Sequence, residues 1–164
     1  MARRPPVNFQ HSLWDRLTNP DLTPGPGVAV TPTSETERIK DSVRRDLEWL
    51  LNSRRCPDDI PAGMTTLEQS LMSYGLPDIT SLSIGDTLEL ERFQRTLESV
   101  IRNFEPRLSK VRVTFTPLEK DRNKATLHYR IDALLRLDPA SEPIVFDTVL
   151  NLGNRAFTVR RDGT

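Results

Sequence analysis

The stretch FEPRLSKVRV, Phe104–Val113, changes the periodicity of the chain and therefore decides the fold. Before this stretch, apolar residues recur at helical spacing, and after it they alternate with polar residues as in a half-buried strand. The change falls on Pro106, which lacks a backbone N–H and disfavours helical geometry in the residue before it. Glu105 and Arg107 flank the proline, although Gly, Asn or Asp is the commoner choice for a simple turn.

The residues before Phe104 predict the strongest helix of the chain. Asp86 is its expected N-cap, and Glu89 lies in the first turn, where a carboxylate suits the helix dipole. One apolar stripe then follows at helical spacing, and it contains Leu90, Phe93, Leu97, Val100, Ile101 and Phe104. This pattern predicts a helix with one face buried.

Two further helices are predicted nearer the N-terminus. The first covers about residues 35 to 52, because Ser34 and Glu37 form a capping box ahead of a periodic apolar run. Its outward positions are expected to be Lys40, Arg44, Arg45 and Glu48. The second is a short helix in TLEQSLMSYG, residues 66–75, with Gly75 as its C-cap.

The chain after Pro106 predicts four strands, at about residues 111–115, 125–137, 144–150 and 156–160. The second is clearest, because every odd position from 125 to 137 is apolar and nearly every even one is polar. DPASEP, residues 138–143, is the expected hairpin turn. Helices first and a meander last predict an α+β fold, with N-terminal helices packed on one face of a C-terminal, mostly antiparallel four-stranded sheet.

The 164 residues are enough for one domain preceded by an arm. Residues 1–33 are rich in Pro and Gly and include TPGPG, which continues neither a helix nor a central strand. HSLWDRL, residues 11–17, has the apolar spacing of a short helix inside this arm. We therefore expect an arm at residues 1–33 and a single α+β domain at residues 34–164.

Composition and motifs argue against several common classes of function. The formal net charge is zero, so nucleic acid is not a favoured partner, and no apolar run predicts membrane insertion. Two histidines and one cysteine, Cys56, give little material for a metal site or a Cys-His dyad. No phosphate-binding or nucleophile motif is present. We expect no catalytic, metal or cofactor-binding residue, and a cytoplasmic location.

Glu105 is the carboxylate whose sequence setting is unusual, because it follows the apolar stripe and precedes a proline. Three interpretations stay open for it. Glu105 and Arg107 form a structural ion pair at the junction of helix and strand, or they are a charged docking point for another chain, or Glu105 is a catalytic acid.

FEPRL, residues 104–108, resembles the Glu-Pro-Arg signature of TssE, the baseplate wedge subunit of bacterial type VI secretion systems. Three other segments agree with that family in their order, namely SLWDRLTNPD at 12–21, RDLEWLLNSRR at 45–55 and SLMSYGLPDITSLS at 70–83. The family is similar to a small wedge protein of contractile phage tails, and the resemblance covers about residues 7 to 160.

This resemblance implies a structural, non-enzymatic part of a cytoplasmic baseplate near the inner membrane. The implied partners are the wedge subunits TssF and TssG and the sheath subunits TssB and TssC, the latter through strand addition to an exposed sheet edge. The signature places the protein-interaction residues at Glu105, Pro106 and Arg107. Two other functions remain as alternatives: a lysozyme-like muramidase acting through Glu105, and a free-standing regulatory adaptor.

Overall fold

The computed structural model describes residues 12–18, 32–56, 63–79, 86–116, 126–137 and 140–162. Helical elements come first along the chain: α1 (Leu13–Thr18), α2 (Pro32–Asn52), α3 (Thr65–Glu68), the 3-10 turn η2 (Leu71–Ser73) and α4 (Thr87–Phe104). Four strands follow: β1 (Leu108–Phe115), β2 (Thr126–Leu135), β3 (Glu142–Asn151) and β4 (Ala156–Arg161). The change from helices to strands occurs at the Glu-Pro-Arg segment.

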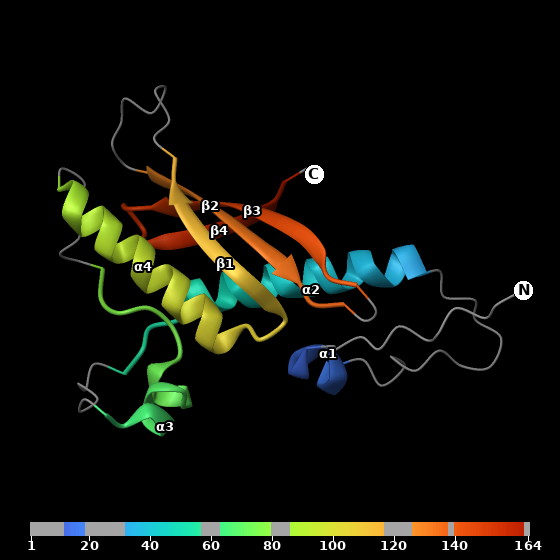
Figure 1. Ribbon diagram of the computed structural model, residues 1–164. Helices are drawn as coiled ribbons and strands as arrows, with labels where there is room; N and C mark the ends of the chain where they lie inside the picture. The colour runs from blue at the N-terminus through green and yellow to red at the C-terminus, as the bar shows by residue number, and fades with distance from the viewer. Residues whose placement is uncertain are drawn as a thin grey trace, which may run out of the picture.

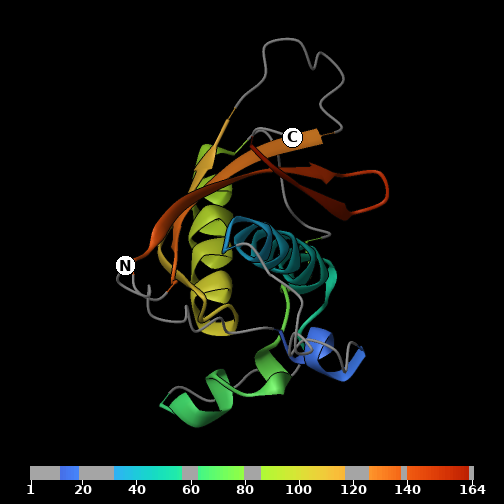
Figure 2. The same cartoon turned by 90° about the vertical axis from the view of Figure 1, so that its right-hand side faces the viewer.

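The four strands form one antiparallel sheet in the order β1-β2-β3-β4. The curved sheet lies across α2 and α4, which cover one of its faces, while α1 and α3 lie at one end of this layer (Figures 1 and 2). The predicted α+β class is confirmed, with the helices on one face of an antiparallel four-stranded sheet.

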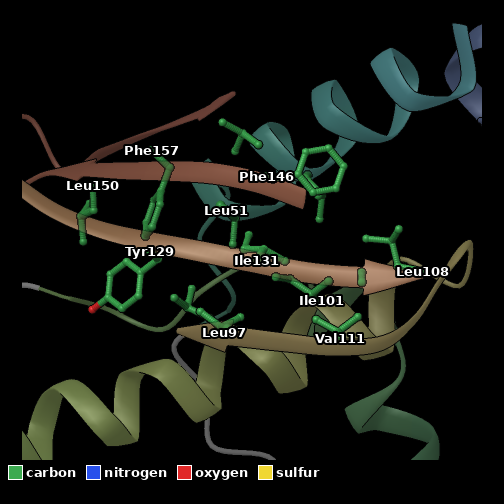
Figure 3. Close-up of a cluster of buried hydrophobic side chains, with 14 of the residues drawn as sticks. Leu51, Leu97, Ile101, Leu108, Val111, Tyr129, Ile131, Phe146, Leu150 and Phe157 are labelled. Atoms are coloured by element: carbon green, nitrogen blue, oxygen red, sulfur yellow. The ribbon is translucent and has the colours of Figure 1, made fainter. Parts of the chain in front are cut away.

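The core lies between this face and the two long helices (Figure 3). As the alternation predicted, the buried residues of β2 are the odd ones: Leu127, Tyr129, Ile131, Ala133 and Leu135. The stripe of α4 contributes Leu90, Phe93, Leu97 and Ile101. Burying each large apolar side chain stabilises the fold by about 1.5–3 kcal/mol. The buried faces of α4 and β2 therefore hold this helix against the sheet.

The two long helices begin differently. The Asp86 side chain accepts a hydrogen bond from the Leu88 N–H at 2.8 Å, which confirms the predicted N-cap of α4. The predicted capping box of α2 is wrong, because the helix begins at Pro32 and Ser34 therefore lies within the helix. Proline suits a first helical position, since its φ is already helical and its missing N–H would have had no partner.

The short helix predicted over residues 66–75 is present, but its extent is wrong, because the chain forms α3 and then the separate turn η2. The Ser70 hydroxyl ends the first helix by donating to the Leu67 carbonyl at 2.7 Å and accepting from the Met72 N–H at 3.3 Å. Gly75 is not a C-cap. It has φ +100°, and the Leu76 N–H beside it bonds to the Ser53 carbonyl at 2.9 Å.

Of the predicted arm, the structure describes only α1 and the start of α2, so TPGPG lies outside the described residues. Asp138 and Pro139 of the predicted DPASEP turn also lie outside them.

We predict that Gly75→Ala destabilises the protein by at least 2 kcal/mol, on the order of a strained backbone plus a steric clash. A Cβ at this position would lie 2.4 Å from the Ser53 backbone oxygen. Gly63→Ala is the matched control, since Gly63 also has positive φ but nothing lies within 4 Å of its added Cβ. Urea unfolding measures both, and equal losses for the two variants would contradict the packing argument.

Candidate functional site

Glu105 and Arg107 form a buried ion pair at the helix-to-strand junction. Their residues are 4% and 8% exposed. Arg107 Nε donates to Glu105 Oε1 at 2.6 Å, and Nη2 donates to Oε2 at 2.5 Å, so the guanidinium contacts both carboxylate oxygens. The backbone N–H of Arg107 also donates to Oε1 at 3.3 Å. This two-point geometry fixes the orientation as well as the charge.

The backbone around the pair explains why it sits at this junction. Glu105 is the C-cap of α4, where its N–H donates to the Ile101 carbonyl at 2.9 Å. Its own carbonyl accepts from the Leu108 N–H at 3.1 Å across the turn. The Arg107 carbonyl accepts from the Arg136 N–H at 2.8 Å, next to the start of β1–β2 pairing. Pro106 stays exposed between the two buried charges.

Helix α2 supplies the next partners of Arg107. Arg107 Nη2 donates to Asp46 Oδ2 at 2.7 Å, and Nη1 donates to Ser42 Oγ at 3.3 Å. Ser42 and Asp46 are four residues apart and therefore share one side of α2. The Arg107 guanidinium thus joins the helix-to-strand junction to a helix that lies some sixty residues earlier in the sequence.

Helix α1 is attached to the other side of these residues. Asp15 Oδ2 accepts from Ser42 Oγ at 2.6 Å, and Asp15 Oδ1 accepts from Arg45 Nη2 at 2.8 Å. Arg45 Nη2 also lies 3.2 Å from Asp46 Oδ1. We call the connected set the junction network, and it contains Asp15, Ser42, Arg45, Asp46, Glu105 and Arg107. Its acids and arginines alternate from α1 through α2 to the junction.

The surroundings of Arg107 favour the charged form of its guanidinium. Burial opposes the charge of Arg107, but Glu105 and Asp46 outweigh that effect and raise the pKa of the guanidinium. Tyr74 lies close by, and burial together with the negative charges of Asp46 and Glu105 raises the pKa of its hydroxyl. A buried pair of this kind is strongly destabilising to break, since the remaining charge is left without a partner.

Aromatic contacts complete the attachment of α1. The rings of Trp14 and Trp49 meet edge to face with centroids 5.4 Å apart, and the Arg45 guanidinium lies 5.2 Å from the Trp49 ring centre. The helix buries none of its own residues, and Leu13 and Leu17 are 71% and 73% exposed. A six-residue helix held in this way depends on a few side chains.

A hollow of about 420 Å³ opens between α1, α2 and the Glu-Pro-Arg segment. Four aromatic residues line it, namely Trp14, Trp49, Tyr74 and Phe104. Tyr74 and Phe104 contact each other edge to face at 5.4 Å. Asp46, Glu105, Pro106 and Arg107 also line the hollow. Aromatic groups beside fixed charges are typical of the central contacts in protein interfaces.

Other kinds of site find little support in the part of the chain that the structure describes. There, three or more His, Cys, Asp or Glu side chains nowhere gather as metal ligands would. Within the same residues, every helix is too short or too polar to span a bilayer.

The sequence singled out Glu105, Pro106 and Arg107, and the structure shows that the two charges pair with each other. Their role in binding a partner stays a prediction. Sequence reasoning missed the other four members of the junction network. Arg45 was expected to face outward, yet its side chain is only 30% exposed and pairs with Asp15. The available signal was Ser42 and Asp46, a polar pair four residues apart that directly flanks the apolar stripe of α2.

We predict that Arg107→Ala lowers the free energy of unfolding by roughly 3–5 kcal/mol, because it leaves Glu105 and Asp46 without their shared cation. The melting temperature should fall on the order of 10 °C. Arg130→Ala is the control, since Arg130 also contacts two acids, Asp132 and Asp162, but its side chain is 46% exposed. That variant should lose less than about 1 kcal/mol. If calorimetry finds similar losses of unfolding free energy for Arg107→Ala and Arg130→Ala, burial of the ion pair does not explain the effect of Arg107.

A second prediction concerns the attachment of α1 at low pH. Burial alone would raise the pKa of the Asp15 carboxyl, but hydrogen bonds from Ser42 and Arg45 and the charge of Arg45 lower it below its ordinary 3.8. A lowered pKa means that this contact stabilises the fold above pH 3.8 and is lost as pH falls through the folded-state value.

Tryptophan fluorescence measures this loss, because Trp14 and Trp49 are the two tryptophans of the chain and contact each other. We expect an emission change below pH 3.8 while far-ultraviolet circular dichroism keeps its folded signal. Asp15→Asn should show the changed emission already at pH 7. An unchanged spectrum in that variant would mean that the Asp15 charge does not hold α1.

Comparison with known proteins places this site within a family. Residues 37–140, more than half of the chain, match the family described as "Baseplate wedge protein gp25". This segment contains five members of the junction network and lacks only Asp15. The match confirms the predicted relation to phage baseplate wedge proteins.

Curated relatives carry a different name. The protein is 35% identical over 105 residues to "Anti-adapter protein IraD" of Salmonella arizonae, covering 64% of this chain and 74% of that protein. It is 30% identical over 134 residues to the proteins of the same name from Salmonella choleraesuis and Salmonella typhimurium, covering 80% of this chain and 97% of each relative. On the strength of the family match over residues 37–140, the chain belongs to the baseplate wedge protein gp25 family.

Proposed function

We propose that this protein is a structural wedge subunit in the baseplate of a type VI secretion apparatus, where it joins other wedge subunits and helps sheath polymerisation begin. Family membership supports the structural baseplate role. The Glu-Pro-Arg signature and the three ordered segments at 12–21, 45–55 and 70–83 support the type VI assignment. The proposed location is the cytoplasmic baseplate beside the inner membrane.

The observation that carries the proposal is the junction network together with its aromatic hollow. We propose that Glu105, Pro106 and Arg107 form the interaction site, and that TssF or TssG binds there. Glu105 and Arg107 hold the turn rigid through their two hydrogen-bonded contacts. Pro106 is thereby presented at the surface, next to the hollow. A surface organised before binding loses less conformational entropy when the partner arrives.

The geometry of Glu105 favours this role over the muramidase alternative. A general acid in glycoside hydrolysis presents a proton to the leaving oxygen of the substrate, opposite a second carboxylate. Both Glu105 oxygens accept hydrogen bonds from Arg107, and the residue is 4% exposed. Asp46, the neighbouring acid of the junction network, is bonded to the same guanidinium. These contacts support a structural role for both carboxylates.

Addition of a strand from TssB or TssC to an edge of this sheet remains part of the proposal. An antiparallel sheet whose outer strands pair on one side only provides the geometry for it. Helix side chains contact the outward backbone groups of both outer strands, so an incoming strand has to replace those contacts.

A regulatory role is the second candidate, and the relatives named as anti-adapter proteins favour it. This chain spans 97% of two of them at 30% identity. The name denotes control of an adapter protein instead of a place in a baseplate. The two candidates therefore differ in the partner that is bound.

Copurification with TssF and TssG tests the proposed function. We predict that Leu13→Glu weakens copurification about tenfold, because Leu13 lines the hollow and the substitution would place a charge among its aromatic contacts. The fold should remain stable, since this leucine is 71% exposed. Leu88→Glu is the matched control, a leucine that is 63% exposed at the start of α4 and is not among the residues that line the hollow.

Loss of copurification in the first variant only, with unchanged melting temperatures, supports docking at this hollow. Equal binding by both variants would move the interface elsewhere. Failure of the wild-type protein to bind TssF and TssG, with capture of an adapter protein instead, would favour the regulatory candidate.

A further inference from the structure

The outer strand β4 has a regular row of backbone groups that point away from the sheet. Asp162 N–H donates to the Val145 carbonyl of β3 at 3.1 Å, so the even-numbered residues at this end of β4 pair with β3. In an antiparallel ladder the intervening residues face the other way. The N–H and C=O groups of Phe157 and Val159 therefore lie on the open side of the sheet.

Asn52, the last residue of α2, occupies the groups of Phe157. Its Oδ1 accepts from the Phe157 N–H at 2.8 Å, and its Nδ2 donates to the Phe157 carbonyl at 2.9 Å. A primary amide has the same donor and acceptor as a peptide unit. The Asn52 side chain thus makes the pair of hydrogen bonds that a residue of a fifth strand would make.

Other side chains of α2 continue along the same strand. Arg44 Nη1 donates to the Val159 carbonyl at 3.3 Å and is itself held by Glu48 at 2.9 Å. Further along, Arg161 of β4 pairs with Glu37 at 2.7 Å. Helix α2 therefore covers the edge of β4 with polar side chains, which is one way that proteins protect an outer strand.

The opposite outer strand, β1, is less regular. The Val113 N–H donates to Glu98 of α4 at 2.8 Å, which covers this edge as well. The β1–β2 register shifts between Ser109 and Arg112, and Lys110 has φ +52°. A bulge with a left-handed residue interrupts the straight backbone that an added strand would follow. Of the two edges, β4 has the continuous geometry.

We propose that β4 is the edge at which this protein receives an extended strand from a sheath subunit, and that Asn52 and Arg44 form a lock that opens first. This inference rests on the proposed function. The number of hydrogen bonds to β4 is conserved in this exchange, because the backbone of the partner strand replaces the two bonds of Asn52 and the one bond of Arg44. Phe157 and Val159 stay in the core, with their residues 3% and 1% exposed.

The position of Asn52 at the helix end makes release local. The final residues of a helix lack the full set of backbone bonds and open more readily than its centre. The Asn52 side chain returns to solvent when it is released, since its residue is already exposed. The rest of α2 keeps its buried leucines, including Leu47 and Leu50, in the core.

The test compares Asn52→Ala with wild type in capture of a TssB–TssC complex. Removing two competing hydrogen bonds should increase the apparent affinity about tenfold. Hydrogen exchange at the Phe157 amide should become faster in the free variant. Ser53→Ala is the control. The Ser53 hydroxyl lies at the same helix end, but its hydrogen bond goes to the Trp49 carbonyl of α2 and not to β4.

Arg44→Ala provides a second opening variant, with a smaller expected gain because one bond is removed. Faster Phe157 exchange with unchanged capture in the Asn52 variant would overturn the lock while leaving sheath binding intact. Self-association of that variant in sedimentation without increased capture would also overturn it, since β4 would then pair with a second copy. No capture by any variant or by wild type would overturn strand addition itself, whereas TssF and TssG binding would still stand.

Discussion

The Glu105–Arg107 ion pair is the interaction on which the arrangement of the molecule depends. It sits where α4 ends and β1 begins, so it fixes the direction in which the chain enters the sheet. The same guanidinium bonds to Asp46 and Ser42 of α2, which places the second long helix relative to that junction. Since Asp15 shares Ser42, the position of α1 is also set through this contact. The end of α4, the start of β1 and helix α2 thus meet at Arg107, and α1 is joined to them indirectly through Ser42.

A buried ion pair stabilises a fold less than its short distances suggest, because both charges lose their hydration. Apolar residues of similar volume would often do as well in terms of stability alone. What the pair provides here is a defined orientation, since Arg107 makes directional bonds to three other side chains. A rigid turn with an exposed Pro106 beside an aromatic hollow suits a surface that another protein recognises. This connects an internal contact with the proposed interface.

The family description and the printed name of the relatives differ, because one refers to a baseplate wedge protein and the other to an anti-adapter protein. Fold alone does not settle function, because function depends on particular surfaces. The surfaces proposed here for partner binding are the hollow beside Pro106 and the edge of β4. The Asn52 side chain covers part of the β4 edge, whereas residues of α1, including Leu13 and Trp14, line the hollow.

The sequence by itself determined the order of elements, the α+β class and most of the buried positions. It did so because a period of two in β2 and a helical period in α4 each select one face for burial, and Pro106 separates the two periods. Local chemistry was also readable, as the Asp86 cap shows. The capping box at Ser34 failed because two acceptable helix starts lie within three residues, and the chain uses Pro32.

Only the tertiary structure decided which polar residues meet. Ser42, Asp46 and Asp15 lie 27 to 65 residues from their partners, and Asn52 lies 105 residues from Phe157. Sequence periodicity reports the face of one element and carries no information on what another element brings to it. Arg45 accordingly looked like a solvent-facing helix residue until α1 placed Asp15 against it. The sequence therefore determined the layers, whereas packing of those layers determined the junction network and the closed edge of β4.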